Sequence, residues 1–282
     1  MRLYWTAPIA ATLGVGTYYY INNQIQKKPT PTNKKLTIEQ QLPTKIITLH
    51  QPKHHHLTDP ATQHQVPTLL HINDSEPLRL IGLGLRTVSF LSIKVYLASF
   101  YADQPILRAL RVVPGWDDHL TKDKLLSVSH TQPQNQIRGE ALFRNLLAAP
   151  AHFAIQITPV RNTDFTHLRD GFCRALTARL KLASQNGTIS EPELEKASLS
   201  INTFRSFFPS GVSVPQGKSM TLIRTASQAL VVEYDGNKLG ELHDPIIARE
   251  LFLAYFADHD PISTKLKESV AEGFSSLYQD SS

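Results

Sequence analysis

The chain has 282 residues, which is enough for one large domain and an appendage. Five of its 29 basic residues lie in the first 35 positions, and the remaining 24 equal the number of acidic residues, so the formal net charge of +5 comes from the N-terminal segment. A nucleic-acid-binding domain carries excess positive charge on its folded body, so this balance excludes nucleic acid as a partner. A single cysteine, Cys173, excludes an intrachain disulfide.

The N-terminal segment has the length of a membrane span. Residues 3–26 contain no charged side chain, and as a helix they would extend about 36 Å, against a hydrocarbon core of about 30 Å. Trp5 lies at one end of this run and Tyr18, Tyr19 and Tyr20 lie near the other, as expected for an interfacial belt. We therefore predict an uncleaved membrane anchor or targeting segment at 1–26; a cleaved secretory signal is the alternative.

A tether is predicted next, at 27–67. This stretch holds six prolines and many Thr and Gln residues, and it has little apolar periodicity, a composition that does not bury enough surface to order itself. Three consecutive histidines, 54–56, do not converge on one metal ion in regular structure, so we expect them to be solvated.

The body, 68–282, reads as one α+β domain. Strand patterns occupy 68–72, 78–85, 88–101, 151–159, 218–225, 228–234 and 238–242, with a tight Asp235-Gly236 turn before the last strand. Amphipathic helices are predicted from Phe165, after a Ser190/Glu193 capping box, after Asp244 and over 266–277. This order predicts an antiparallel sheet with helices layered on one face.

The stretch 79–101 carries the most functional information. Alternate residues of a strand share a face, so Gly82, Gly84 and Arg86 are expected to lie together. We expect the glycines to leave a concave, mostly apolar space beside the cation, suited to an amphipathic organic anion. Alternatively, Arg86 pairs with a structural carboxylate or extends to water.

Several segments together resemble the chalcone isomerase fold family. These are Gly82-x-Gly84-x-Arg86 followed by 90–96, the Phe-Phe-Pro-x-Gly turn at 207–211, the hairpin at 235–240, and Pro245 to Ser263. The segment 161–172 resembles the fungal mitochondrial branch, the chalcone-isomerase-domain proteins called altered inheritance of mitochondria. The resemblance covers about 68–280 and implies an open-faced β-sandwich and a mitochondrial protein. Together with the predicted anchor at 1–26, it leads us to expect association with the inner membrane.

The resemblance also implies a ligand site. In the plant isomerases an arginine orients the substrate, and Arg86 matches it, whereas Leu91 falls where those enzymes have a threonine. Leucine cannot hydrogen-bond a developing enolate, so we expect no catalytic residue and a binder of an apolar anion such as a fatty acid, with Arg86 and Tyr96 as ligand-binding residues. The alternatives are an active intramolecular lyase of chalcone isomerase type and a structural scaffold without ligand.

His167 raises haem as a possible cofactor, because neutral imidazole is a common axial ligand and haem propionates pair with arginine. On a helical wheel His167 lies roughly 150° from the centre of the apolar stripe, so a ligand there would need a second pocket behind the helix. A local hydrogen bond in the first helical turn is the alternative.

Overall fold

The computed structural model describes residues 47–50, 52, 54–72, 75–88, 93–128 and 137–279. Its largest sheet has seven antiparallel strands in the order β11-β10-β9-β6-β5-β4-β3. Their bounds are β3 Leu69–Leu70, β4 Leu78–Val88, β5 Ile93–Ala102, β6 Phe153–Pro159, β9 Met220–Arg224, β10 Leu230–Tyr234 and β11 Asn237–Leu242. Two small two-stranded sheets pair β1 (His56–Thr58) with β2 (Gln65–Pro67) and β7 (Thr163–Asp164) with β8 (Ser213–Val214).

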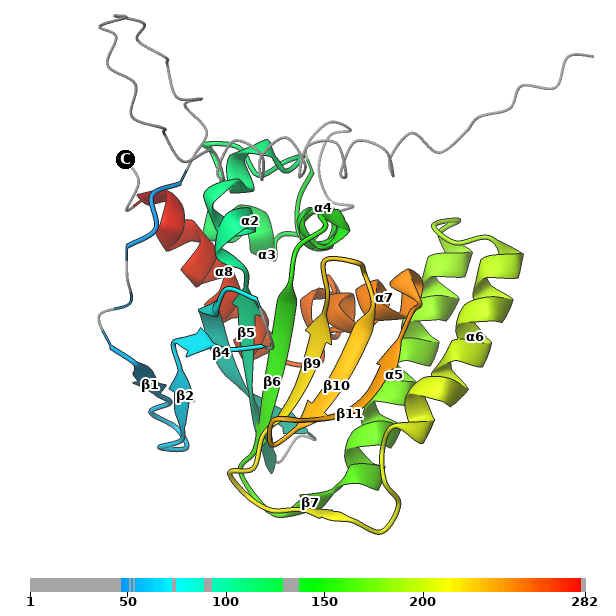
Figure 1. Ribbon diagram of the computed structural model, residues 1–282. Helices are drawn as coiled ribbons and strands as arrows, with labels where there is room; N and C mark the ends of the chain where they lie inside the picture. Colours follow the sequence, from blue (N-terminus) through cyan, green and yellow to red (C-terminus); the bar gives the residue numbers. More distant parts are fainter. Residues whose placement is uncertain are drawn as a thin grey trace, which may run out of the picture.

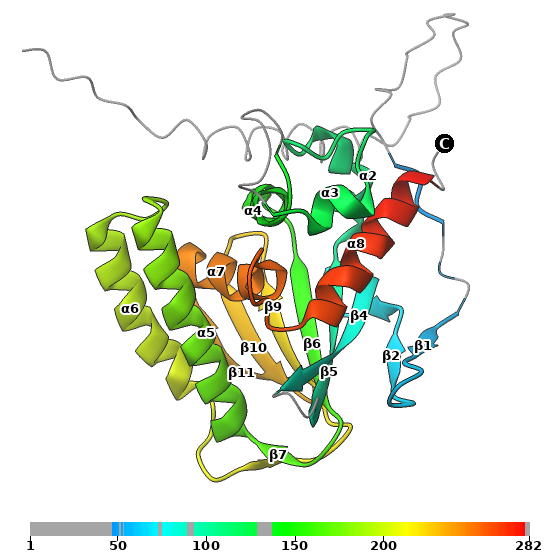
Figure 2. The same ribbon diagram turned by 180° about the vertical axis from the view of Figure 1, so that it is seen from behind.

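The long helices cover one face of this sheet, as Figures 1 and 2 show from opposite sides. They are α5 (Phe165–Gln185), α6 (Glu191–Ser206), α7 (Pro245–Phe256) and α8 (Thr264–Gln279). Shorter elements lie at one end of the sheet: α2 (Gln104–Arg108), a 3-10 turn (Leu110–Val112), α3 (Lys122–Leu126) and α4 (Glu140–Ala148). The predicted α+β fold, with helices layered on one face of an antiparallel sheet, is confirmed.

The main hydrophobic core lies between the sheet and the helices. Alternate residues of β5, including Tyr96, Ala98 and Phe100, belong to this core. A much smaller cluster, centred on Tyr101 and Ile223, lies on the opposite face. The unequal clusters follow from the period-2 alternation of strand side chains, which sends one set of residues toward the helices and the other away.

The predicted turn and caps form as expected. Asp235 and Gly236 both have positive φ, 49° and 80°, as a two-residue type I′ hairpin turn requires. The Ser190 backbone N–H donates to Glu193 Oε2 at 2.7 Å in the capping box of α6. Asp244 Oδ1 accepts from two backbone N–H groups of the first turn of α7.

A buried ion-pair cluster joins α4, α5 and α7. Glu250 of α7 is fully buried and accepts from Arg179 of α5 at 2.9 Å and from Arg144 of α4 at 3.1 Å. Arg179 also donates to Glu140 at 2.6 Å. Burial by itself would raise the pKa of Glu250, but the neighbouring arginines, Arg144 foremost, hold that pKa below its ordinary value.

The predicted membrane anchor, 1–26, lies outside the described residues, as does most of the predicted tether. The described end of that tether is structured: β1 pairs with β2, and Ile47 is fully buried and donates its N–H to the Arg108 carbonyl at 2.9 Å. Sequence composition favoured an unordered tether here, because the short apolar run at 46–49 is too brief to show a clear periodicity. No helix in the described ranges is long and apolar enough to cross a membrane.

Candidate functional site

Arg86 and Tyr96 lie directly opposite one another on the antiparallel strands β4 and β5. Arg86 Nη1 donates to the Tyr96 hydroxyl at 3.4 Å, and the guanidinium carbon lies 5.6 Å from the centroid of the Tyr96 ring. The two side chains therefore project from the same face of the sheet. Tyr96 is buried, whereas Arg86 is half-buried at the edge of the core, so the tyrosine ring supports the cation from one side.

A second tyrosine completes this group. Tyr255 of α7 is fully buried, and its hydroxyl lies 3.0 Å from that of Tyr96. Burial raises the pKa of Tyr255 well above its ordinary value, with Tyr96 adding to the shift and Arg86 opposing it. The Tyr255 phenol is therefore neutral at physiological pH. Sequence reasoning missed this residue, although a tyrosine in the almost wholly apolar helix at 245–256 was an available signal.

No carboxylate in the described ranges forms an ion pair with Arg86. Burial by itself would lower the pKa of Arg86, but the two tyrosines outweigh it and the pKa is raised. The guanidinium is thus charged, partly withdrawn from water and hydrogen-bonded to the Tyr96 hydroxyl. Such a group is stabilised by an anion that reaches it from outside.

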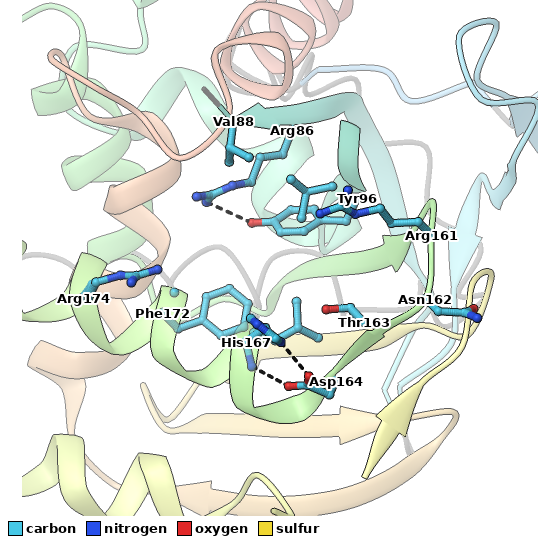
Figure 3. A pocket seen from close by; sticks show the side chains of 13 residues that line it. Arg86, Val88, Tyr96, Arg161, Asn162, Thr163, Asp164, His167, Phe172 and Arg174 are labelled. Carbon is cyan, nitrogen blue, oxygen red and sulfur yellow. Dashed lines mark hydrogen bonds and ion pairs between the residues drawn. The ribbon is translucent and has the colours of Figure 1, made fainter. Parts of the chain in front are cut away.

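A cleft of about 630 Å³ opens beside Arg86 (Figure 3). One wall is formed by β4 and β5, another by the loop and β7 at 161–164, and a third by α5. The lining residues are Arg86, Val88, Val95, Tyr96, Arg161, Asn162, Thr163, Asp164, His167, Leu168, Gly171, Phe172 and Arg174. The lining combines apolar side chains with polar and charged ones, as a site for an amphipathic small molecule requires.

His167 lies on this same cleft, so the expectation of a second pocket behind the helix was wrong. The cleft follows the flank of α5, where His167, Gly171 and Arg174 are spaced i, i+4 and i+7 beside Leu168 and Phe172. Residues from both the apolar stripe and the polar side of α5 therefore line this one cleft.

The predicted local hydrogen bond of His167 is also present. Asp164 caps α5 by accepting from the His167 backbone N–H at 2.7 Å, and its other oxygen lies 2.6 Å from His167 Nδ1. These bonds, the backbone one first, hold the pKa of Asp164 below its ordinary value. The His167 side chain is 80% exposed.

The space attributed to Gly82 and Gly84 is filled, which corrects one expectation. A Cβ on Gly82 would lie 2.6 Å from the Val270 backbone nitrogen, and one on Gly84 would overlap the Leu266 backbone. The two glycines therefore let α8 approach β4 closely. The cleft is bounded instead by valines on the strands and by α5.

The described residues contain no group of three or more His, Cys, Asp or Glu side chains placed to hold a metal ion. The three consecutive histidines at 54–56, which are described, therefore do not belong to such a group. Leu91, the position that matches the threonine of plant isomerases, lies outside the described residues.

Residues 76–271 match the family model described as "Chalcone isomerase like". The chain belongs to this family. A relative from Debaryomyces hansenii, named altered inheritance of mitochondria protein 18, mitochondrial, is 28% identical over 73% of this chain and 69% of its own length. The Eremothecium gossypii protein of the same name is 30% identical over 71% of this chain and 67% of its own length.

A solved structure shares the chalcone-isomerase-like fold. It is a fatty-acid binding protein from Arabidopsis thaliana, with a TM-score of 0.59 and 21% identity, covering 80% of this chain and all of that one. At this identity the likeness concerns the fold alone.

Proposed function

We propose that this chain is a non-catalytic binder of an apolar anion, with a fatty acid as the favoured ligand. The observation that carries the proposal is Arg86: a charged, half-buried guanidinium at a cleft, bonded to Tyr96 and paired with no carboxylate of the described chain. A ligand carboxylate would supply the missing counter-charge through charge-assisted hydrogen bonds.

The walls of the cleft suit the rest of such a ligand. Val88 and Val95 on the strands and Leu168 and Phe172 on α5 offer apolar surface to a hydrocarbon chain. We expect the Tyr96 hydroxyl, which accepts from Arg86 Nη1 at 3.4 Å, to share the carboxylate with that arginine. The Arabidopsis protein, which is named as a fatty-acid binder, supports this reading because it shares the fold.

The test is displacement of a fluorescent fatty acid by dodecanoate, measured on the purified full chain. Arg86→Gln is expected to weaken dodecanoate binding at least about tenfold, since a hydrogen bond to a charged group contributes about 1.5–3 kcal/mol. Lys94→Gln is the matched control, because Lys94 is exposed on the neighbouring strand and does not line the cleft. Equal affinity in Arg86→Gln and the wild type would refute the proposal.

Turnover separates this proposal from an active isomerase. We expect a panel of chalcones to cyclise in the presence of the protein at the solution rate. Cyclisation above that rate, abolished by Arg86→Ala, would establish an intramolecular lyase instead. Native mass spectrometry that finds neither lipid nor porphyrin bound would favour a scaffold.

Haem is a second candidate, because His167 faces the same cleft as Arg86. Asp164 binds His167 Nδ1, which leaves Nε2 available, and a carboxylate behind the imidazole is the usual partner of an axial histidine. Arg86 would pair with a propionate. The 80% exposure of the His167 side chain disfavours this candidate relative to a fatty acid. A Soret band that shifts in His167→Ala would support haem, and an unchanged spectrum would remove His167 as its ligand.

We further propose that the protein is mitochondrial and is associated with the inner membrane through 1–26. The names of the relatives from Debaryomyces hansenii and Eremothecium gossypii support the compartment. The uncharged run at 3–26 supports the membrane association.

A further inference from the structure

The lining of the cleft carries more positive charge than one carboxylate would neutralise. Three guanidinium groups line it, those of Arg86, Arg161 and Arg174. The one carboxylate in the lining, Asp164, is bound to the backbone and the imidazole of His167. The lining therefore has an excess of at least two positive charges.

The three arginines come from different walls. Arg86 projects from β4 and Arg174 from α5, and in Figure 3 their side chains extend toward the same end of the cleft. Arg161 lies on the loop after β6 and is exposed, as is Arg174. By contrast, Arg169 of the same helix is not part of the lining and pairs with Asp170 at 2.9 Å.

We propose that the ligand of this cleft is an amphiphile whose headgroup carries at least two negative charges, of the class of a long-chain phosphate monoester. The inference rests on the proposed anion site at Arg86 and specifies its ligand. A lone carboxylate would pair with Arg86 and leave the exposed Arg161 and Arg174 without a charge of the ligand to bind, whereas a phosphate dianion has three acceptor oxygens to share among guanidinium groups from different walls.

Three probes of equal chain length test the charge of the headgroup: dodecanoate, dodecyl phosphate and methyl dodecyl phosphate. Methyl dodecyl phosphate has the tetrahedral headgroup of dodecyl phosphate but the single negative charge of dodecanoate. Affinities are measured at pH 7.5, below the critical micelle concentrations, where the phosphate monoester is mostly dianionic because its second pKa is about 6. We expect dodecyl phosphate to bind about tenfold more tightly than either monoanion, as two partly exposed charge pairs allow.

Variants then assign the preference to residues. Arg161→Gln/Arg174→Gln is expected to reduce the preference to about twofold or less while leaving the affinity for dodecanoate nearly unchanged. Lys181→Gln/Lys196→Gln is the matched control, because it removes the same charge from exposed sites on α5 and α6 that do not line the cleft. This control is expected to keep the tenfold preference.

The outcomes separate this inference from the proposed function. Equal binding of the three probes to the wild type, with dodecanoate binding still lost in Arg86→Gln, would overturn the dianionic headgroup and leave the fatty-acid site in place. Binding of none of the probes would overturn both. A preference that survives in Arg161→Gln/Arg174→Gln would also overturn the assignment, because the selectivity would then arise elsewhere.

Discussion

The hydroxyl groups of Tyr96 and Tyr255 lie 3.0 Å apart and join β5 to α7 directly beneath Arg86. The hydrogen bond of this pair fixes the Tyr96 ring, which lies against the Arg86 guanidinium, from the side of the hydrophobic core. The pair is also a hydrogen-bonded link between the sheet and the helical layer in an otherwise apolar environment, where an unpaired hydroxyl is costly.

Tyr255→Phe is expected to lower the free energy of unfolding by about 1–2 kcal/mol, because the Tyr96 hydroxyl loses a buried partner and retains only Arg86. Urea denaturation followed by circular dichroism measures the change. Tyr234→Phe, which removes a hydroxyl from the half-buried end of β10, is the control and is expected to cost about 0.5 kcal/mol or less. Equal losses in the two variants would contradict a structural role for the tyrosine pair.

The same pair predicts a loss of stability at alkaline pH. The pKa of Tyr255 is raised on folding, so its contribution is complete below the unfolded pKa of about 10 and is lost as the pH rises above that value. Tyr255→Phe should therefore show a shallower decline in the free energy of unfolding above pH 10 than the wild type. Parallel declines in the two proteins would refute this assignment.

Glu250→Gln is expected to destabilise the protein by about 3 kcal/mol or more. The change leaves Glu140 as the carboxylate that Arg144 and Arg179 share, in a site from which water is largely excluded. Glu195→Gln on the exposed side of α6 is the matched control and is expected to change stability by about 0.5 kcal/mol or less. Equilibrium denaturation at pH 7 measures both, and a loss below about 1 kcal/mol in Glu250→Gln would show that the ion pairs contribute little.

Acid titration tests the same residue. The folded pKa of Glu250 is lowered, so its stabilisation is present above the unfolded pKa of about 4.3 and is lost as the pH falls below that value. The wild type should lose stability between about pH 4.3 and the lower folded pKa, and Glu250→Gln should lose less over that interval. Identical acid profiles would contradict the lowered pKa.

Gly84→Ala is expected to cost at least about 3 kcal/mol, because the added methyl group overlaps the backbone of α8 and neither main chain can yield cheaply. Gly171→Ala is the control: its Cβ would meet nothing within 4 Å, and a helix interior favours alanine over glycine by about 1 kcal/mol. Thermal denaturation should therefore move the two variants in opposite directions. An unchanged melting temperature in Gly84→Ala would disprove the close packing of β4 on α8.

The proposed anchor predicts that the full chain stays in the membrane pellet after alkaline carbonate extraction. Deletion of 1–26 should release the protein into the supernatant, since that run supplies the apolar length needed for a span. Release of the intact chain by carbonate would reject the anchor.

Much of the fold was predictable because strand and helix periodicities are long in this chain. The predicted strand at 151–159 is present as β6 at 153–159, and the hairpin around Asp235-Gly236 forms β10 and β11. The predicted break before Val88 was wrong, since β4 continues through that residue. A short apolar strand has no internal signal that marks its last residue.

The candidate site was only partly predictable. The common face of Gly82, Gly84 and Arg86 follows from strand alternation. Tyr255, however, approaches from a helix more than 150 residues away in sequence, and local patterns cannot report such a contact. The role of Gly82 and Gly84 was misread for the same reason. A glycine in a strand indicates that another group lies close to the strand backbone. The sequence does not say whether that group is a ligand or a helix.

The close packing of α8 on β4 has a consequence for the order in which the wall of the cleft formed by β4 is assembled. β4 is the second strand of the main sheet in chain order, and α8 is the final helix, so the strand that carries Arg86 gains its backing only after nearly the whole domain has been synthesised. A nascent chain still lacking 264–279 would leave the glycine face of β4 bare to solvent. Among the described elements, the helix that completes the packing of β4 is therefore the last to be synthesised.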